Sequence, residues 1–490
     1  MNKRMRWYDH ITINIYWLGL NIASGIITPV LLPYLVVLYM PEAYKNTYLA
    51  TIRVIGLAVA MLVQPLAGLL SDRSTLRWGR RRPYIFAGAL LNVVFLSIVG
   101  VSYNLQGSSL DGFFQSTFGA TTAYAALLAG TVLLQVSSNV AHGALQGLIP
   151  DLVPEDQRGR SSGVKAVLEL LPVFLVLFIG PLVDAGRIWL TVGIIMASFL
   201  GTMLVTVLFA HEDPLREKPS GGIGEPTLRL VALTVIFVAV TQAAVWFVRV
   251  SGAWLTARGA SIALQVALVG LAGLIGMAGA IFVGVYLGAR VGIGKEAPQQ
   301  TSFIWWVINR LLFLAAVGSI QGSAQYFLSD VLHIPNAASM TTVLMAAVAG
   351  FLLPSALGGG YLADRVGHKR LVAISGLVAT AGTVMLIFAT NVPLVIVSGC
   401  IIGLGAGTFM ATNWALGTKL APSRDAGRYL GISNLAGAGA GIVGAGIGGP
   451  MADFFNGLQP GLGYLVVFAV YAALFLLSIA ALTRVKESAT

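Results

Sequence analysis

The fold is decided by the stretch Gly68-Leu-Leu-Ser-Asp-Arg-Ser-Thr-Leu-Arg-Trp-Gly-Arg-Arg-Arg-Pro83, which places one aspartate and five arginines between two apolar runs. Each run is long enough to cross the roughly 30 Å hydrocarbon core of a bilayer as a helix. A charged segment between two such runs is typical of a loop at the membrane surface. A weaker version recurs at Gly360–Arg370, with Asp364 and Arg365 at its centre, and predicts two homologous halves.

The composition indicates an integral membrane protein, because 57% of the 490 residues are hydrophobic and only 10% are charged. Soluble domains are about 25% charged. The net charge of +11 does not predict nucleic-acid binding, because the lysines and arginines lie in short loops between apolar runs. One cysteine and five scattered histidines give no metal-ligand pattern, and no phosphate-binding loop follows a strand. We therefore expect no cofactor, no metal and no enzymatic activity.

A helix needs about 20 mostly apolar residues to span a bilayer. By this criterion the sequence contains six spans, then two, then six more, which predicts an all-α membrane protein with fourteen transmembrane helices. The predicted spans are 11–39, 47–71, 83–103, 120–149, 163–183 and 188–210, then 229–250 and 262–288, then 303–328, 338–361, 371–389, 392–417, 429–452 and 461–483.

The predicted domains are a six-helix bundle at 1–210, two extra helices with their linkers at 211–302, and a second six-helix bundle at 303–490. Most lysines and arginines fall on alternate loops, which places both termini and both arginine-rich loops in the cytoplasm. A second repeat supports the two halves, because Pro154, Gly159, Arg160 and Gly163 match Pro422, Gly427, Arg428 and Gly431 at one constant offset.

Two six-helix halves with a Gly-x-x-x-Asp-Arg-x-Gly-Arg-Arg-like loop after the second helix of each half resemble the major facilitator superfamily. The longer first loop, from Ser71 to Pro83, is similar to that of the glycoside–pentoside–hexuronide cation symporters and the related sucrose transporters. The segment Asn139–Asp151 is similar in layout to the fourth helix of sucrose transporters. The resemblance implies a secondary transporter that works by alternating access, with a small-molecule substrate, a proton as coupling ion and membrane lipids around it.

The sequence also departs from these families. Sucrose transporters have an acidic residue where this chain has Gln135, and the second span lacks the carboxylates with which melibiose-type members bind sodium. Those families have twelve spans, whereas extra central pairs occur in proton-coupled oligopeptide transporters and in one class of drug exporters. The Glu-rich first-helix motif of the oligopeptide family is absent, which argues against peptides.

Four large polar residues of the fourth span lie on one helical face at spacings of 4, 3 and 4. They are Gln135, Asn139, His142 and Gln146. Such a stripe is costly in lipid and should face the protein or a cavity, where amides suit a polyhydroxylated solute. The alternative is that these side chains join neighbouring helices by hydrogen bonds.

Two further groups complete the candidate site. Arg310, Gln321 and Gln325 follow one face of the span at 303–328 and form the second part of the predicted substrate site, unless Arg310 only extends to the interface. Glu169 lies inside a span with Lys165 one turn before it. This pair is our candidate for proton coupling, because ionisable groups within spans are candidate functional residues, and a cytoplasmic ion pair is the alternative.

The charged loops supply candidate gating residues, which could form ion pairs in one conformation and release them in the other. They are Asp72, Arg73, Arg80, Arg81, Asp364 and Arg365. The alternative is that the arginines orient the chain and bind anionic headgroups.

These observations predict a proton-coupled symporter of a sugar, glycoside or similar small polar solute, monomeric, in a cell inner membrane. A proton-driven exporter of amphipathic drugs or lipids is the alternative within transport, and a membrane sensor or scaffold is the alternative outside it.

Overall fold

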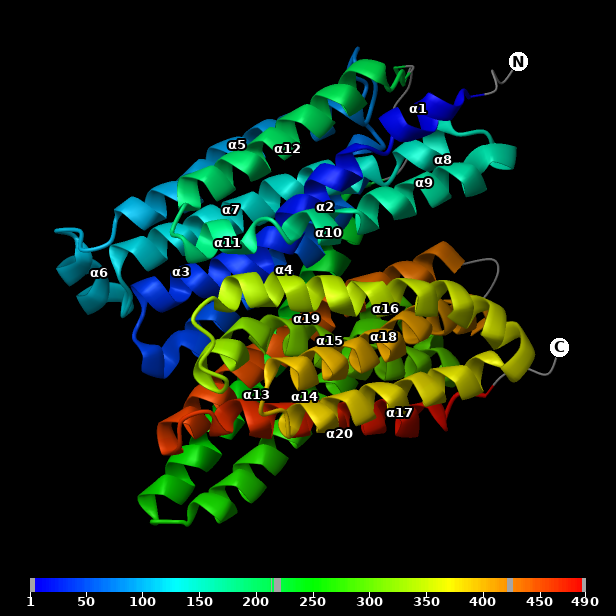
Figure 1. Cartoon of the computed structure of the whole chain (residues 1–490). Coiled ribbons are helices and arrows are strands. Elements are labelled where there is room, and N and C mark those ends of the chain that lie inside the picture. The colour runs from blue at the N-terminus through cyan, green and yellow to red at the C-terminus, as the bar shows by residue number, and fades with distance from the viewer. Residues whose placement is uncertain (1–4, 213, 216–221, 421–425, 487–490) are drawn as a thin grey trace. The chain divides into compact units, whose positions relative to one another are not determined.

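The computed structural model describes residues 5–212, 214–215, 222–420 and 426–486 and shows a helical protein. The chain forms two compact units (Figure 1). Unit 1 consists of Met1–Met40 and Val59–Leu228, and unit 2 consists of Pro41–Ala58 and Arg229–Thr490. The long helix α4 (Lys45–Ser71) therefore begins in unit 2 and ends in unit 1.

Unit 1 contains the elements from the N-terminus to the start of α13, apart from the beginning of α4. They are α1 (Trp7–Thr12), α2 (Tyr16–Ile26), the π-helical turn η1 (Ile27–Leu31), α3 (Leu32–Tyr39), α5 (Arg82–Asn104), α6 (Asp111–Phe118), α7 (Thr122–Leu145), α8 (Leu148–Leu152), the short turn η3 (Glu155–Gln157), α9 (Arg158–Leu170), α10 (Pro172–Val176), α11 (Gly180–Asp184) and α12 (Ile188–Phe209).

Unit 2 contains the remaining elements. They are the turn η2 (Glu42–Tyr44), most of α13 (Gly224–Ala257), α14 (Ile262–Gly292), the turn η4 (Gly294–Gln299), α15 (Thr301–Asp330), α16 (Ala337–Val366), α17 (His368–Ile387), α18 (Val392–Leu420), α19 (Ala426–Leu458) and α20 (Leu462–Leu482).

Twelve segments of the described residues are long and apolar enough to span a membrane, and they coincide with twelve of the fourteen predicted spans. The predicted span 163–183 is divided among α9, α10 and α11. Pro172 and Pro181 explain the interruptions, because proline lacks the N–H that a continuous helix needs and fits the first turn of a new one. The predicted span 429–452 lies within the 33-residue helix α19. A total of fourteen spans remains a prediction.

In unit 1, α5 packs closely on α7 and α12, as Figure 1 shows. A Cβ at Gly88 would lie 2.7 Å from the carbonyl oxygen of Ser137, so only glycine allows this approach of α5 to α7. Asn92 accepts hydrogen bonds from the hydroxyl groups of Ser137 (2.5 Å) and Ser138 (3.0 Å). Small residues and interhelical hydrogen bonds are the usual means of joining helices in lipid.

In unit 2, the helix pair predicted as an insertion packs on the later helices of the chain, because α14 contacts α15, α19 and α20. Phe237 of α13 is buried between two glycines, Gly284 of α14 and Gly439 of α19. Each would place a Cβ within 2.7 Å of the Phe237 ring. The pair is therefore an integral part of the packing of unit 2.

Candidate functional site

The polar stripe of α7 forms two hydrogen-bonded pairs. Asn139, which is 6% exposed, donates through Nδ2 to the carbonyl oxygen of Gln135 at 2.8 Å and to its Oε1 at 3.2 Å. One turn further on, Nε2 of the exposed Gln146 lies 3.3 Å from Nε2 of His142. The stripe therefore presents linked amide and imidazole groups, which both donate and accept hydrogen bonds.

Trp17 of α2 brings this stripe together with the predicted coupling pair. Its ring meets the His142 ring edge-on, with 4.9 Å between the centroids. The Nζ of Lys165 in α9 lies over the Trp17 ring, 4.0 Å from the centroid, and 3.5 Å from Oε1 of Glu169. Lys165 and Glu169 are about one-third exposed. We call these two residues with Trp17 and the α7 stripe the Trp17 cluster.

The helices around Trp17 are irregular. The α2 helix continues into the π-helical turn η1, and a turn at Leu171 separates α9 from α10. The short helices α9 and α10 pack against α2. Irregular backbone at membrane depth is tolerated where it is buried in protein or lines a cavity, and interrupted helices are typical of transporter sites.

Trp17 was not among the sequence-predicted site residues. Its position inside the first span was a signal that the sequence contained, because tryptophan in membrane proteins is usually found at the ends of spans, near the membrane interface. The spacing along α7 could not identify it, because the contact joins helices that are far apart in the sequence.

Arg310 of α15 belongs to a second polar group, within unit 2. Its Nη1 donates to Oδ1 of Asn413 at 3.3 Å, and its guanidinium lies 5.1 Å from the ring centroid of Trp414. Asn413 in turn donates to Asn309 at 2.7 Å. The Nε of Arg310 is buried and has no hydrogen-bond partner among the described residues.

The other two predicted residues of α15 lie away from Arg310. At 1.5 Å per residue, Gln321 and Gln325 are roughly 16 Å and 22 Å farther along the helix axis. Gln321 is exposed and Gln325 is 6% exposed. The common face predicted for the three residues therefore extends along the helix, and a role of this face in substrate binding stays a prediction.

The arginine-rich loop of unit 1 folds around Arg81. This side chain is only 7% exposed and pairs with Asp72 at the end of α4 and with Asp151 of α8, where its Nε is 2.9 Å from Oδ2. It also donates to the Ser71 hydroxyl at 2.7 Å. Arg80 pairs with the other oxygen of Asp151. Asp72 therefore forms an ion pair with Arg81, while a gating role for it stays a prediction. Asp151 is a central partner that the sequence reasoning did not include.

A second acidic residue, Glu212, follows α12 and holds the start of α5. Its carboxylate accepts hydrogen bonds from the backbone N–H groups of Arg81 (2.9 Å) and Arg82 (3.0 Å). It lies against Gly79, whose φ of +101° requires glycine. Burial raises the pKa of the Glu212 carboxyl above its ordinary value, and the two backbone donors oppose this shift. We call Arg80, Arg81, Asp72, Asp151 and Glu212 the Arg81 cluster.

The remaining predicted gating residues are Arg73 in unit 1 and Asp364 and Arg365 in unit 2. Arg73 ends α4 through a backbone hydrogen bond to Leu70 at 3.2 Å. In unit 2, Asp364 is 77% exposed and lies 4.0 Å from His368, while Arg365 contacts the ring of Tyr361. The described part of the Gly360–Arg370 loop therefore has no counterpart of the buried Arg81 hub. Residues 421–425, at the start of the second repeated loop, lie outside the described residues.

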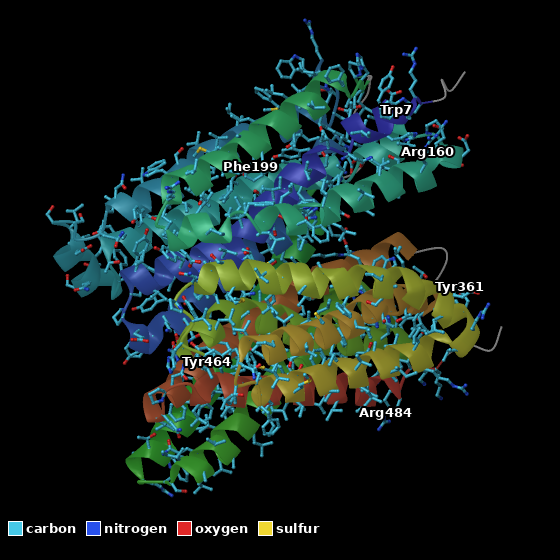
Figure 2. All side chains as sticks on the ribbon, viewed as in Figure 1. Trp7, Arg160, Phe199, Tyr361, Tyr464 and Arg484 are labelled. Carbon is cyan, nitrogen blue, oxygen red and sulfur yellow. The ribbon has the colours of Figure 1, made fainter. Side chains whose placement is uncertain are left out.

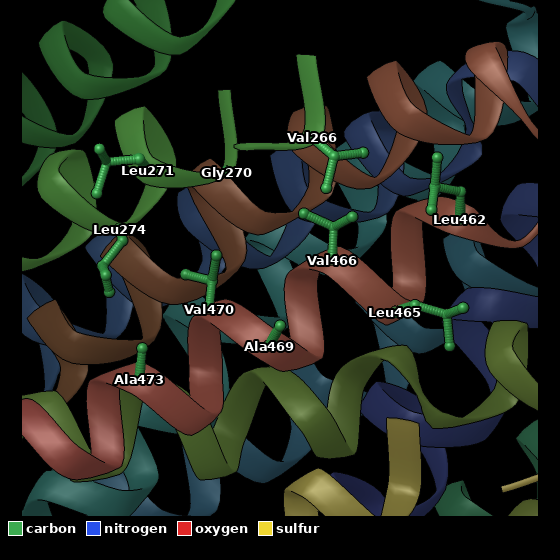
Figure 3. Close-up of a pocket in the computed structure, with 10 residues that line it drawn as sticks. All are labelled: Val266, Gly270, Leu271, Leu274, Leu462, Leu465, Val466, Ala469, Val470 and Ala473. Atoms are coloured by element: carbon green, nitrogen blue, oxygen red, sulfur yellow. The ribbon is translucent and has the colours of Figure 1, made fainter. Parts of the chain in front are cut away.

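A hollow lies between α14 and α20, away from the predicted site residues (Figure 3). It measures about 490 Å³ and is lined by aliphatic side chains such as Leu271, Leu274 and Val466. Leu271 is 51% exposed, as expected of a side chain that faces lipid. A polar solute would find no hydrogen-bonding side chain there.

Comparison with known proteins gives a consistent assignment. Residues 17–297 match the family model described as "MFS/sugar transport protein", and residues 306–490 match the model described as "Major Facilitator Superfamily". A sucrose transport protein of Arabidopsis thaliana is 28% identical over 40% of this chain and 36% of its own length. A minor myo-inositol transporter of Bacillus subtilis is 31% identical over 20% of this chain and 24% of its own.

Solved structures agree on the fold. A peptide transporter in complex with sulfate aligns with a TM-score of 0.64 at 14% identity, over 98% of this chain and 95% of its own. A D-xylose-proton symporter aligns with a TM-score of 0.60 at 16% identity, over 98% of both chains. The all-helical major facilitator-like membrane fold and the predicted family are confirmed, whereas two six-helix bundles with an inserted pair and fourteen spans remain predictions. The chain is a multi-pass membrane protein that belongs to the MFS/sugar transport protein family of the major facilitator superfamily, whose members are transporters and not enzymes.

Proposed function

We propose that this transporter carries a sugar, a glycoside or a similar small polar solute by proton symport and alternating access. The Trp17 cluster is the observation that carries the proposal. It combines the amides of Gln135 and Asn139 with the His142 ring, the Trp17 face and the Lys165 ammonium. A few placed polar groups beside aromatic surface are typical of small-molecule sites.

The names of the matched proteins support the same class of solute. Sucrose and myo-inositol are polyhydroxylated and uncharged, and the relatives named for them match parts of this chain. Such solutes present many hydroxyl groups that both donate and accept hydrogen bonds. The stripe on α7 offers groups of the same kind, so each hydroxyl group that leaves water can be satisfied.

Lys165 provides a route for coupling, because it contacts both Glu169 and the Trp17 ring. Protonation of Glu169 would remove the negative partner of Lys165 and leave this ammonium free to move relative to Trp17. The Arg81 cluster would gate the predicted cytoplasmic side. In this proposal Asp72, Arg73, Arg80 and Arg81 form the principal gate, and Asp364 and Arg365 act in the second half.

Export of amphipathic drugs or lipids is the second candidate. One observation favours it, namely that unit 2 has an apolar hollow of about 490 Å³ beside α14 and a mainly apolar hollow of about 470 Å³ beside α13, whose lining also includes Arg249 and Thr256. An amphipath could enter such hollows from the bilayer without leaving an apolar environment.

A thermal-shift screen of the purified full chain tests the two candidates, because a ligand that binds the folded state raises the unfolding temperature. Sugars, glycosides and amphipathic drugs are compared at a neutral and an acidic pH. We expect stabilisation by a sugar or glycoside, larger at the acidic pH, and its loss in Asn139→Leu. The control Gln242→Leu makes the same chemical change on an exposed position of α13 and should keep the response.

Uptake into proteoliposomes tests the coupling. Glu169→Gln should abolish uptake that is driven by an acidic exterior while preserving sugar-induced stabilisation. Uptake equal to that of the native protein would remove Glu169 from the mechanism. Stabilisation only by amphipaths would refute sugar transport and favour export.

A further inference from the structure

The first half of α4 packs within unit 2, against a row of glycines on α19. A Cβ at Gly441 would lie 2.7 Å from Leu57, and one at Gly449 would lie 2.6 Å from both Ala50 and the carbonyl oxygen of Asn46. The two helices run antiparallel, because residues later in α19 meet residues earlier in α4. The glycine-rich run at 437–449 thus lets α19 approach α4 closely.

At the end of this row, Asp453 of α19 accepts hydrogen bonds from the first turn of α4. Its Oδ2 accepts from the backbone N–H of Thr47 at 2.7 Å. Its Oδ1 accepts from the backbone N–H of Asn46 at 3.2 Å and from Nδ2 of the same residue at 2.8 Å. The first N–H groups of a helix have no partner within it and carry its positive dipole end, so an ionised carboxylate is a strong acceptor for them.

A second carboxylate holds the same turn by other means. Asp330 of α15 pairs with Nζ of Lys45 at 2.7 Å and accepts from the Tyr464 hydroxyl at 2.5 Å. Nδ2 of Asn46 lies 3.3 Å from that hydroxyl and thereby links the two carboxylates. Tyr464 lies near the start of α20, and Arg484 lies just beyond the other end of this helix (Figure 2). In the predicted orientation this is the non-cytoplasmic end of unit 2.

The two carboxylates differ in what protonation would do. A proton on Asp330 would leave Lys45, which is 4% exposed, beside a neutral group. Asp453 is 7% exposed and is held by neutral donors, with no cationic partner among the described residues. Protonation of Asp453 therefore weakens hydrogen bonds to α4 without leaving a buried cation unpaired.

We propose that Asp453 is a proton-binding residue of the transport cycle, which holds the first turn of α4 on α19 while ionised and releases it when protonated. The inference rests on the proposed transport function and adds a titrating group in unit 2 to the pair in the Trp17 cluster. Protonation from the non-cytoplasmic side would then favour opening on that side, as proton-driven uptake requires.

Other charged and titratable groups lie at this end of unit 2, on the elements around Asp453. They are Glu42, Lys45 and Arg53 from η2 and α4, Arg249 from α13, Tyr326 and Asp330 from α15, and Tyr464 and Tyr471 from α20. Asp330 is the carboxylate from which Asp453 must be distinguished, since both are linked through Asn46.

A buried serine reports on separation of α4 from unit 2. Ser319 of α15, which is 3% exposed, lines a cavity of only about 20 Å³ together with Asn46, Ala50 and Gly449. This volume admits about one water molecule, so a maleimide cannot enter unless α4 moves. Cys400 is the single cysteine of the chain, so Ser319→Cys in a Cys400→Ala background gives one labelling site.

The experiment measures how fast a membrane-impermeant maleimide labels this full-length variant in proteoliposomes. Each rate is divided by the rate at which the same maleimide labels a free thiol in solution at that pH, which corrects for the pH dependence of the thiol itself. We expect the corrected labelling rate to rise about tenfold from pH 8 to pH 5, the effect of weakening one charged hydrogen bond. Asp453→Asn should label fast at both pH values. Asp330→Asn should keep the pH response.

Two results would overturn the proposal. One is a corrected rate that does not change with pH while Asp453 is native, a measurement that does not depend on how any Asp453 variant folds. The other is an unchanged pH response in Asp453→Asn and in Asp453→Ala. Because the assay uses no solute, failure here leaves sugar-induced stabilisation intact, whereas failure of the proposed function would appear as the absence of that stabilisation.

Discussion

Replacing Arg81 should destabilise unit 1 more than any other single arginine change in the loop between α4 and α5. Arg81 is 7% exposed and joins Asp72, Asp151 and Ser71. Asp72 is 48% exposed, so solvent screening reduces its pair to the roughly 0–1 kcal/mol of a surface ion pair. Asp151 is 15% exposed, and a hydrogen bond to such a charged group is worth about 1.5–3 kcal/mol.

Together with the Ser71 bond, these contacts give a loss of about 3 kcal/mol for Arg81→Ala. For a unit of this size, 1 kcal/mol lowers the unfolding temperature by about 2–4 °C, so we expect a fall of roughly 6–12 °C. The assay is thermal unfolding of the detergent-purified chain, followed by tryptophan fluorescence.

Arg77→Ala is the matched control, because Arg77 is an exposed arginine of the same loop. A surface substitution of this kind changes stability by less than about 0.5 kcal/mol, which corresponds to less than about 2 °C. The Arg81 contacts would be energetically irrelevant if the two variants unfolded at the same temperature. Asp151→Asn extends the test, because it leaves both Arg80 and Arg81 without their shared carboxylate and should be more harmful than Asp72→Asn.

Three further predictions follow from single contacts. Burial raises the pKa of the Glu212 carboxyl, so the folded chain binds this proton more tightly than the unfolded chain. The contribution of Glu212 to stability therefore falls as pH rises above about 4.5. As pH rises from this value, the unfolding temperature of Glu212→Gln should increase relative to that of the native protein. Trp17→Ala should abolish sugar-induced stabilisation whereas Trp17→Phe keeps part of it, since the aromatic face between His142 and Lys165 is retained; equal responses would exclude the ring from the site. Gly449→Ala should lower stability by about 1–3 kcal/mol through overpacking against Ala50, measured by thermal unfolding, while the control Gly457→Ala on the same helix meets no atom within 4 Å and should not.

The sequence was sufficient to predict the helical membrane fold and the superfamily, because both depend on apolar length and on the loop at Gly68–Pro83. Apolar length could not show that the fifth predicted span is divided into α9, α10 and α11. Pro172 and Pro181 were visible, but proline is tolerated in many membrane helices, and neighbouring elements decide whether the helix continues.

The candidate sites were predictable only in part. Helical periodicity placed Gln135, Asn139, His142 and Gln146 on one face, because residues three and four apart are neighbours within a single helix. The partners Trp17, Asp151 and Asp453 come from other helices, and Glu212 follows α12. Periodicity carries no information about which helices are adjacent, so these contacts required the structure.

The placement of α4 gives these contacts a common consequence. Its last turn is tied in unit 1, where Asp72 pairs with Arg81, and its first turn is tied in unit 2, where Asp453 and Asp330 hold Asn46, Thr47 and Lys45. Pro65 interrupts the hydrogen bonding of the helix between these ends, and proline is a common cause of bending. Since each end is held by carboxylates, a change of protonation or pairing at one end alters the restraint on a helix shared by both units. We therefore expect Asp453→Asn and Arg81→Ala to have non-additive effects on uptake, because both act on the two ends of α4. Additive effects would mean that α4 does not couple its two ends.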